Sequence, residues 1–186
     1  KSNLVGELSE IVEIDSGIRV ENACASGGSA IYLAYNLAKT GNTVLVTGVE
    51  KMSCCRRGEL SYLLAYAERT TERLNGFNFP SLAALMMKRY IKKYKTEREV
   101  FYEMPINSHR NAKNNPYAQF KFEIDREIIE SSPVVAEPLH LLECAPVSDG
   151  AASAVITPER GDVYILSCEL SAGGYTIMCN EVEIPS

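Results

Sequence analysis

Cys24 is the residue of this sequence best placed to carry out covalent chemistry. It lies between a predicted strand, residues 18–21, and an apolar helix predicted from Ser29 onward. The nucleophilic form of cysteine is the thiolate, which a helix N-terminus favours through its unpaired N–H groups and the positive end of its dipole. Small neighbours permit a tight turn and let a bulky thioester approach the sulfur: Ala23, Ala25, Ser26, Gly27 and Gly28. The alternative is a buried structural cysteine, and the spacing alone favours neither interpretation.

The remaining cysteines show no pattern of a metal site or a disulfide framework. Cysteine occurs at positions 24, 54, 55, 144, 168 and 179, without a CxxC pair, so we expect no metal site. Free thiols are typical of a reducing compartment, and we therefore expect a cytoplasmic protein. Cys54 and Cys55 are adjacent at the start of a loop, and we expect this adjacency to be incidental.

Composition excludes two classes of partner. The chain has 186 residues, of which 46% are hydrophobic and 23% charged, as in ordinary globular proteins. A formal net charge of -5 argues against a general nucleic-acid surface, because phosphate binding requires positive potential. No apolar run is long enough to span a bilayer. We therefore expect neither a nucleic-acid nor a membrane partner.

The elements that must position Cys24 follow from the pattern around it. Residues 4–21 predict a helix in their first half, broken at Gly17, and then the strand before Cys24. From Ser29 to Ala38 almost every position is apolar or small, which predicts a helix buried on most faces. Thr43–Thr47 predicts an interior strand. A strand, a tight turn, a helix and a strand in this order indicate an α/β fold.

The middle of the chain is more helical. Pro80 near the start of an apolar stripe predicts a helix beginning at Phe79. Thr96 followed by Glu99 fits a capping box for a helix through Met104. The Asn-rich stretch 105–122 reads as an extended loop. A short helix at residues 126–130 and strands at 152–157 and 162–170 complete the prediction.

These elements suggest a core with an insertion. The predicted domains are residues 1–51 with 133–186 as the α/β core, and residues 52–132 as an inserted helical and loop region.

Several blocks of this sequence resemble one enzyme family. Val20–Ile31 (VENACASGGSAI) is similar to the nucleophile motif of thiolases, and Gly48–Ser53 (GVEKMS) to the strand-end motif that follows it. Further blocks occur in the family's order: FPSL at 79–82, NSH at 107–109 with NNPYAQF at 114–120, and CAPVSDGAA at 144–152. The later blocks point to the branch of thiolases related to sterol carrier protein and their archaeal relatives. This order of blocks is far more specific than a single cysteine motif.

The resemblance implies a fold and an activity. Thiolases have two similar layered α/β halves, each with a mixed sheet and helices on both faces, so the resemblance implies this layered fold, of which the chain holds an incomplete part. Thiolases form dimers or tetramers, so we expect a homodimer or homotetramer. They transfer acyl groups between coenzyme A thioesters without a permanently bound cofactor. By resemblance, Cys24 is the acylated nucleophile and its backbone N–H is an oxyanion-hole donor. In the archaeal branch, thiolases associate with a zinc-ribbon/OB-fold subunit and a condensing synthase, which become possible partners.

The resemblance also suggests substrate-binding residues. Ser148, Asp149 and Gly150 match the family loop that passes near the pantetheine arm, although a tight turn before a strand explains them equally well. His109 lies near one of the blocks, and a loop histidine bonded to backbone is the favoured alternative. His140, in an apolar run, is expected to be partly buried and hydrogen-bonded. A basic helical group either binds phosphates of coenzyme A or is a solvated face, and we favour the solvated face: Lys88, Arg89, Lys92, Lys93 and Lys95.

The sequence departs from the family in one important respect. The family's Gly-His-Pro histidine and Cys-x-Gly cysteine, which activate the nucleophile and transfer protons, do not occur in these residues. The resemblance therefore covers most of an N-terminal half with its inserted loop region. Two functions follow: an acyltransferase of thiolase type, and a non-catalytic thiolase-like subunit or truncated remnant that acts as a structural or assembly partner.

Overall fold

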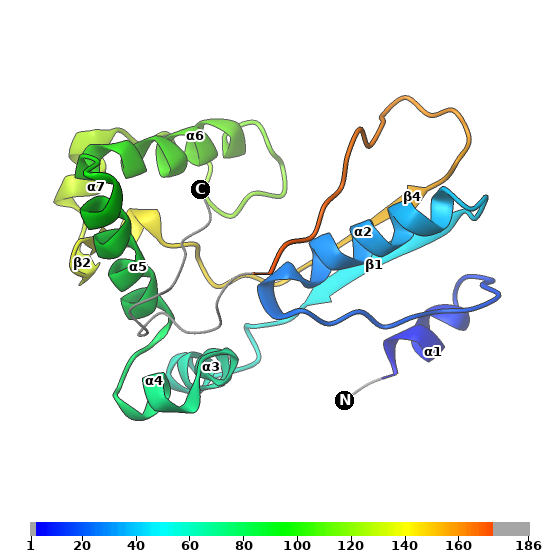
Figure 1. The fold of residues 1–186 in the computed structure, drawn as a ribbon, viewed down its shortest axis with the longest axis horizontal. Helices are drawn as coiled ribbons and strands as arrows, with labels where there is room; N and C mark the ends of the chain where they lie inside the picture. The colour runs from blue at the N-terminus through cyan, green and yellow to red at the C-terminus, as the bar shows by residue number, and fades with distance from the viewer. Residues whose placement is uncertain (1–2, 173–186) are drawn as a thin grey trace. The chain divides into compact units, whose positions relative to one another are not determined.

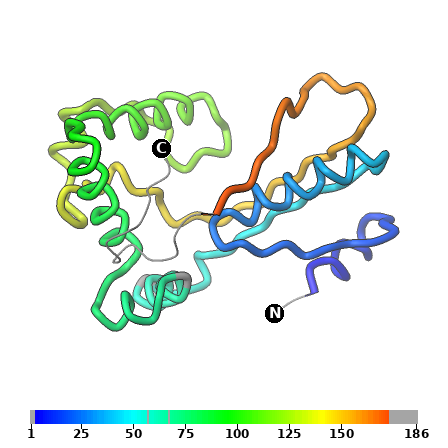
Figure 2. The backbone as a smooth tube through the Cα atoms, viewed as in Figure 1, coloured from blue at the N-terminus to red at the C-terminus, as the bar shows by residue number. Residues whose placement is uncertain are grey.

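A computed structural model describes residues 3–172, apart from the side chains of Arg57 and Ala67. The described chain divides into two compact units, whose backbone is traced in Figure 2. The first unit comprises the residues up to Val49 together with Ala151–Ser171, and the second comprises Glu50–Gly150. The predicted core and insertion, with limits at residues 51 and 133, stay a prediction. None of the helices in the described range is long and apolar enough to cross a bilayer.

The first unit holds the segment around Cys24. Its elements are α1 (Leu4–Ser9), the 3₁₀ turn η1 (Ala23–Ala25), α2 (Ser26–Ala38) and, apart from one terminal residue each, the strands β1 (Val44–Glu50) and β4 (Gly150–Ile156) (Figure 1). β1 and β4 form a two-stranded sheet. The hydroxyl of Thr43 contacts that of Thr157 at 3.1 Å, and the hydroxyl of Thr47 contacts that of Ser153 at 3.0 Å. Because partner numbers fall as the first numbers rise, the strands run antiparallel.

Helix α2 is buried along one side only. Ser29, Ala34 and Ala38 are its buried residues, and the last two are one helical turn apart. Ile31 remains 37% exposed. The prediction of a helix buried on most faces is therefore wrong for the described chain. Helix α2 has the apolar composition on which the prediction rested, but only three of its residues are buried by the described chain.

The second unit is mostly helical. Its elements are α3 (Arg57–Leu64), η2 (Ala65–Ala67), α4 (Thr70–Leu74), α5 (Phe79–Tyr94), η3 (Arg98–Tyr102), α6 (Glu103–Ala112), α7 (Arg126–Ser131), β2 (Val134–Ala136), β3 (Leu139–His140) and η4 (Leu141–Glu143). α5 begins where the sequence predicts: the N–H of Ser81 donates to the side chain of Asn78 at 3.0 Å, and Pro80 occupies the first turn. α7 confirms the predicted short helix.

The core of the second unit forms where η3, α7 and the segment before α7 meet. Tyr102, Ile124 and Ile129 are its buried residues, and Ile106 and Leu142 pack against them. β2 and β3 pair antiparallel in a small hairpin. α5 contacts both strands of this hairpin.

The predicted loop at residues 105–122 is wrong in its first half, because α6 runs from Glu103 to Ala112. Pro105 does not disrupt α6, since it lies in the first turn, where its missing N–H has no helical partner to lose. The predicted capping box is also wrong. The hydroxyl of Thr96 is buried without a hydrogen-bond partner among the described residues, and Glu97 occupies the N-cap of η3.

The strand predictions have mixed outcomes. The predicted strands at 43–47 and 152–157 are confirmed as β1 and β4. Residues 18–21 and 162–170 are irregular instead of extended in a sheet. A strand-prone run becomes a strand only when another strand pairs with its backbone, and no described segment pairs with these two. Helices and small sheets together confirm the α/β class, with two-stranded sheets in place of the expected larger one.

Candidate active site

Cys24 lies in η1, immediately before the first turn of α2, and its side chain is exposed. The preceding residue, Ala23, has a φ angle of 45°. This left-handed conformation costs a residue with a Cβ about 1–2 kcal/mol. Strained backbone of this kind persists only where the surroundings hold it, and it concentrates at functional sites.

Side chains hold the turn around Cys24 in place. The N–H of Asn22 donates to the hydroxyl of Ser26 at 2.8 Å, and that hydroxyl donates to the carbonyl of Ala23 at 2.7 Å. The N–H of Ala23 donates to the carboxylate of Glu21 at 2.8 Å. The amide of Asn22 also donates to the buried hydroxyl of Ser29 at 2.9 Å, which ties the turn to the body of α2. These bonds offset the strain at Ala23.

The first turn of α2 has open space beside it. A Cβ built on Gly27 or Gly28 meets no heavy atom of the described residues within 4 Å. Glycine inside a helix costs about 0.5–1 kcal/mol relative to alanine. Packing within the described chain therefore gives no reason for these glycines. An exposed thiol beside such space can react with a bulky electrophile.

The predicted substrate loop in the second unit is organised by Asp149. Its carboxylate accepts from the N–H groups of Met52 and Ser53, each at 2.8 Å, and from the hydroxyl of Ser53 at 2.5 Å. We call these three bonds the Asp149 anchor. The hydrogen bond from the Ser53 hydroxyl, followed by the backbone bonds, holds the pKa of Asp149 below its ordinary value. The anchor joins the segment after β1 to the segment before β4.

Ser148 and His109 both contact the segment at 119–122. The hydroxyl of Ser148 donates to the side-chain oxygen of Gln119. Nδ1 of His109 is 3.0 Å from the carbonyl oxygen of Phe122, and its ring stacks on Phe120 at a centroid distance of 6.2 Å. His109 lies on α6, which corrects its predicted place in a loop, while the predicted backbone bond is confirmed.

Sequence reasoning did not find the partners of these predicted site residues. Met52 and Ser53 lie in one block of the family resemblance, and Asp149 lies in another. That both segments belong to such blocks was the available signal for a contact between them. Cys24 belongs to the first unit, whereas His109 and Ser148–Gly150 belong to the second. Within the second unit, the structure brings Ser148 and His109 to the same short segment.

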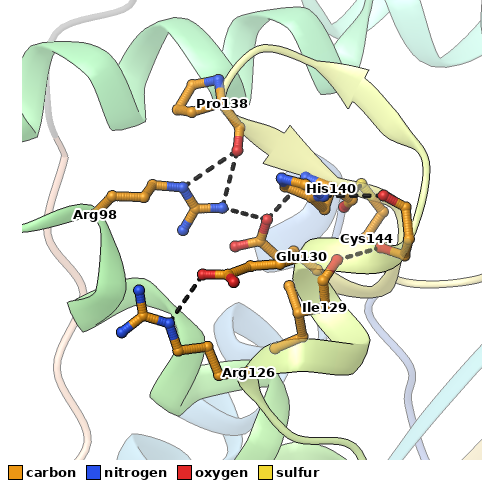
Figure 3. Close-up of polar contacts among 9 residues, drawn as sticks. Arg98, Arg126, Ile129, Glu130, Pro138, His140 and Cys144 are labelled. Atoms are coloured by element: carbon orange, nitrogen blue, oxygen red, sulfur yellow. Dashed lines mark hydrogen bonds and ion pairs between the residues drawn. The ribbon is translucent and has the colours of Figure 1, made fainter.

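A buried polar network in the second unit joins η3 to the β2–β3 hairpin and to η4 (Figure 3). Arg98 donates to the carbonyl of Pro138 at 2.9 and 3.2 Å and forms an ion pair with the carboxylate of Glu143. The N–H of His140 donates to the same carboxylate at 2.7 Å. The Glu143 side chain is only 4% exposed, so both charges of the pair depend on this geometry.

The other titratable groups near this network are structural. His140 is half-buried, with Nδ1 3.0 Å from the carbonyl oxygen of Ser132, which confirms the predicted bonded histidine. The thiol of Cys144 donates to the carbonyl of His140 at 3.6 Å, and burial raises its pKa. These contacts give neither residue a position for nucleophilic or base chemistry.

The basic residues on and just after α5 match a further prediction, whereas the expected absence of a metal site stays a prediction. Lys88, Lys92 and Lys95 are exposed, as expected for a solvated face. Within residues 3–172, no three His, Cys, Asp or Glu side chains cluster in a way that could hold a metal ion. Cys179 lies outside the described residues.

Comparison with known proteins identifies the family. The model of the thiolase N-terminal domain matches residues 7–160. The chain belongs to the thiolase family, and the resemblance to its archaeal and sterol-carrier-related branch is confirmed.

Individual relatives agree with this assignment. The acetyl-CoA acetyltransferase of Methanothermobacter thermautotrophicus is 38% identical over 84% of this chain and 41% of its own length. That of Methanocaldococcus jannaschii is 40% identical over 83% of this chain and 40% of its own length. Human sterol carrier protein 2 is 30% identical over 91% of this chain and 32% of its own length. The chain thus spans about two fifths of the length of the two archaeal relatives, and a smaller share of the third.

A solved structure shares the fold. The Ltp2-ChsH2(DUF35) aldolase superimposes with a TM-score of 0.54 at 27% sequence identity, over 69% of this chain and 35% of the matched chain.

Proposed function

We propose that this chain is the nucleophile-bearing part of a thiolase-type acyltransferase, which moves acetyl or other acyl groups between coenzyme A thioesters through an acyl-Cys24 intermediate. The observation that carries the proposal is the exposed thiol of Cys24 in a strained, hydrogen-bonded turn at the N-terminus of α2. The open space beside Gly27 and Gly28 is where the thioester approaches. The archaeal acetyl-CoA acetyltransferases among the relatives support the substrate class.

The chemical step is a thioester exchange. The thiolate of Cys24 attacks the carbonyl carbon of the acyl thioester, and the carbonyl oxygen becomes an oxyanion. When the tetrahedral intermediate collapses, the bond to the sulfur of coenzyme A breaks, and this sulfur leaves as a thiolate that takes up a proton. The acyl group remains on Cys24. The N–H of Cys24 is the proposed donor to the oxyanion.

The proton transfers are not assigned to a residue of this chain. His109 and His140 each place Nδ1 against a backbone carbonyl, and neither lies in a Gly-His-Pro motif. Coenzyme A thioester is the substrate, and we propose no permanently bound cofactor. The proposed site of action is the cytoplasm.

Ser148, Asp149, Gly150 and His109 are the proposed substrate-binding residues, with different roles. The Asp149 carboxylate accepts three hydrogen bonds from Met52 and Ser53, so its proposed role is to position the substrate-binding loop. The proposed role of Ser148 and His109 is indirect, because both bind the segment at residues 119–122.

Assembly is part of the proposal. We propose a homodimer or homotetramer, and partners that include a zinc-ribbon/OB-fold subunit and a condensing synthase. The name of the structural neighbour joins Ltp2 with ChsH2(DUF35), which supports association of such a chain with a second type of subunit. Light scattering on the purified chain would measure the oligomeric state, and a monomeric mass would contradict the dimer.

The alternative function is a non-catalytic thiolase-like subunit with a structural or assembly role, which keeps the fold and a binding surface without completing the reaction. A thiolysis assay on the chain alone separates the two functions, because turnover comparable to that of a complete thiolase would refute the inert subunit.

Acyl transfer to Cys24 provides the decisive experiment. The chain is incubated with acetyl-coenzyme A, and acetylated positions are located by intact-mass measurement and peptide mapping. The proposal expects a hydroxylamine-sensitive acetyl group on Cys24. Labelling on other residues with Cys24 unmodified would refute the nucleophile assignment.

A further inference from the structure

Cys54 and Cys55 form a contact that the proposed acyl transfer does not use. Their sulfur atoms are 3.9 Å apart. The thiol of Cys54 is exposed, and that of Cys55 is half-buried. A turn presents both residues: the N–H of Cys55 donates to the carbonyl of Met52 at 3.3 Å, and the thiol of Cys54 donates to the carbonyl of Lys51 at 3.4 Å.

The other cysteines that the structure describes lack such a partner. Among the described cysteines, Cys24, Cys144 and Cys168 make no contact with another sulfur atom, and Cys144 donates to a backbone carbonyl. The contact between Cys54 and Cys55 is therefore a specific feature of the segment after β1. It also lies directly beside the Asp149 anchor, because Met52 and Ser53 precede the pair.

We propose that Cys54 and Cys55 are a reversible dithiol–disulfide site, whose oxidation by a low-molecular-weight disulfide releases the Asp149 anchor. The thiolate of Cys54 attacks one sulfur of the small disulfide, which forms a mixed disulfide and expels one small thiol. The thiolate of Cys55 then attacks the sulfur of Cys54, and the second small thiol leaves. Two protein thiols become one disulfide, and one small disulfide becomes two small thiols, so atoms and electrons balance.

The order of the two attacks follows from the environment of the pair. Cys54 is the more exposed sulfur and is accessible to a small disulfide. The hydrogen bond with Cys54, followed by burial and nearby negative charge, raises the pKa of Cys55. A raised pKa disfavours Cys55 as the first attacking thiolate. Once Cys54 carries the mixed disulfide, its sulfur is held next to Cys55, and the second step is intramolecular.

Adjacency makes the proposed disulfide easy to reduce. The Cα atoms of successive residues are about 3.8 Å apart, whereas disulfide-linked residues usually have Cα atoms roughly 4.4–6.8 Å apart. A disulfide between Cys54 and Cys55 is therefore strained, and strained, exposed disulfides are those that form and break in response to the surroundings. This property suits a regulatory site better than a permanent cross-link.

Disulfide formation must also disturb the residues before the pair. The sulfur atoms have to move from 3.9 Å to a bonding distance of about 2.05 Å, which requires rotation of the turn that Cys55 closes onto Met52. The N–H groups of Met52 and Ser53 and the Ser53 hydroxyl supply all three bonds of the anchor. Rotation of this turn withdraws these donors from Asp149. The effect on catalysis rests on the proposed function, but the disulfide and the released anchor do not.

Oxidised glutathione is the probe that tests the site. The 186-residue chain is treated with it, then measured by intact mass, by peptide mapping and by hydrogen exchange. The expected product has lost two hydrogens in the peptide that contains Cys54 and Cys55, and dithiothreitol restores the original mass. Exchange of the Met52 and Ser53 amides becomes about tenfold faster or more in the oxidised chain, because their hydrogen bonds to a charged acceptor are lost.

Variants separate the intended reaction from general thiol oxidation. Cys55→Ser should trap glutathione on Cys54 as a stable mixed disulfide, whereas Cys168→Ser, the matched control that removes a thiol outside both proposed sites, should close the disulfide between Cys54 and Cys55 like the parent chain. A chain that accumulates glutathione on Cys54 or Cys55 without closing the disulfide would overturn the proposal. A closed disulfide with unchanged exchange at Met52 and Ser53 would overturn the link to Asp149.

Discussion

The two units of this chain bury different kinds of residue. The buried positions described in the first unit are Ser29, Ala34 and Ala38, all small and all on α2. The second unit buries large side chains, among them Tyr102 and Ile129. Since the favourable free energy of burial scales with apolar area, most of the hydrophobic stabilisation of the described chain belongs to the second unit.

The polar interactions of the two units differ in their exposure to water. In the second unit, Arg98 and Glu143 form an ion pair that is largely withdrawn from water. In the first unit, the turn around Cys24 is held by short, exposed hydrogen bonds that involve the side chains of Glu21 and Ser26. The comparison teaches that substitutions in the second unit should mainly change stability. Substitutions around Cys24 should mainly change reactivity.

The largest expected effect is on acyl transfer. Cys24→Ser removes the thiolate, and we expect complete loss of the acetyl group at this position after incubation with acetyl-coenzyme A. Because the side chain is exposed, the free energy of unfolding should change by no more than about 0.5 kcal/mol. Peptide mapping and urea denaturation measure the two quantities. Cys168→Ser is the control and should be acetylated on Cys24 like the parent, and a large stability loss in Cys24→Ser would contradict the comparison.

The next largest effect is on the stability of the second unit. Arg98→Met leaves the buried Glu143 carboxylate without its guanidinium, which should lower the free energy of unfolding by about 3–5 kcal/mol. Urea denaturation measures this loss. Arg126→Met is the matched control, because Arg126 is 54% exposed and pairs with Glu99 and Glu130. Figure 3 shows the pair with Glu130. The control should cost about 1 kcal/mol or less, and equal losses in the two variants would refute a special role for the buried pair.

A smaller substitution should change stability and reactivity in opposite directions. Gly28→Ala adds a Cβ where the described residues leave space, and should stabilise the chain by about 0.5–1 kcal/mol. We expect slower acetylation of Cys24, because the same Cβ occupies the proposed path of the thioester. The time course of labelling measures the rate.

Gly58→Ala provides the control for this substitution. Gly58 lies in the first turn of α3, and a Cβ there also meets no described heavy atom within 4 Å. It should give a similar gain in stability with an unchanged acetylation rate. If Gly28→Ala reacted as fast as the parent, the space beside α2 would have no part in substrate approach.

The smallest predicted effect is the pH dependence from Asp149. Its pKa is lowered in the folded chain by the Ser53 hydroxyl and the backbone N–H groups. The stabilisation is therefore complete above the unfolded pKa of about 3.9 and is lost as the pH falls through the lower folded value. Asp149→Asn should reduce this acid-side loss in a series of urea denaturations between neutral and acidic pH. Asp162→Asn controls for the loss of one negative charge, and an identical pH profile in the parent and Asp149→Asn would contradict the anchor.

Local signals predicted several elements correctly, although the strand expected at residues 18–21 before Cys24 is irregular. The position of the cysteine before α2, the strands β1 and β4, and the start of α5 at its proline all follow from patterns within a few residues. The same approach failed for α6, because asparagines and Pro105 indicated a loop. A proline in the first helical turn has no N–H bond to lose, so α6 forms around it and carries His109.

Sequence by itself determined the family of this protein and the place of its candidate nucleophile, since both depend on residue types in a local order. Only the tertiary structure decided which distant residues bond to one another within the second unit. The Asp149 anchor joins residues 96 and 97 positions apart, and the pair of Arg98 and Glu143 spans 45 positions. Periodicity and turn signals report on neighbours within one or two helical turns, whereas such bonds depend on how the elements pack. The same packing placed the thiols of Cys54 and Cys55 in contact beside the anchor, which their adjacency in the sequence did not reveal.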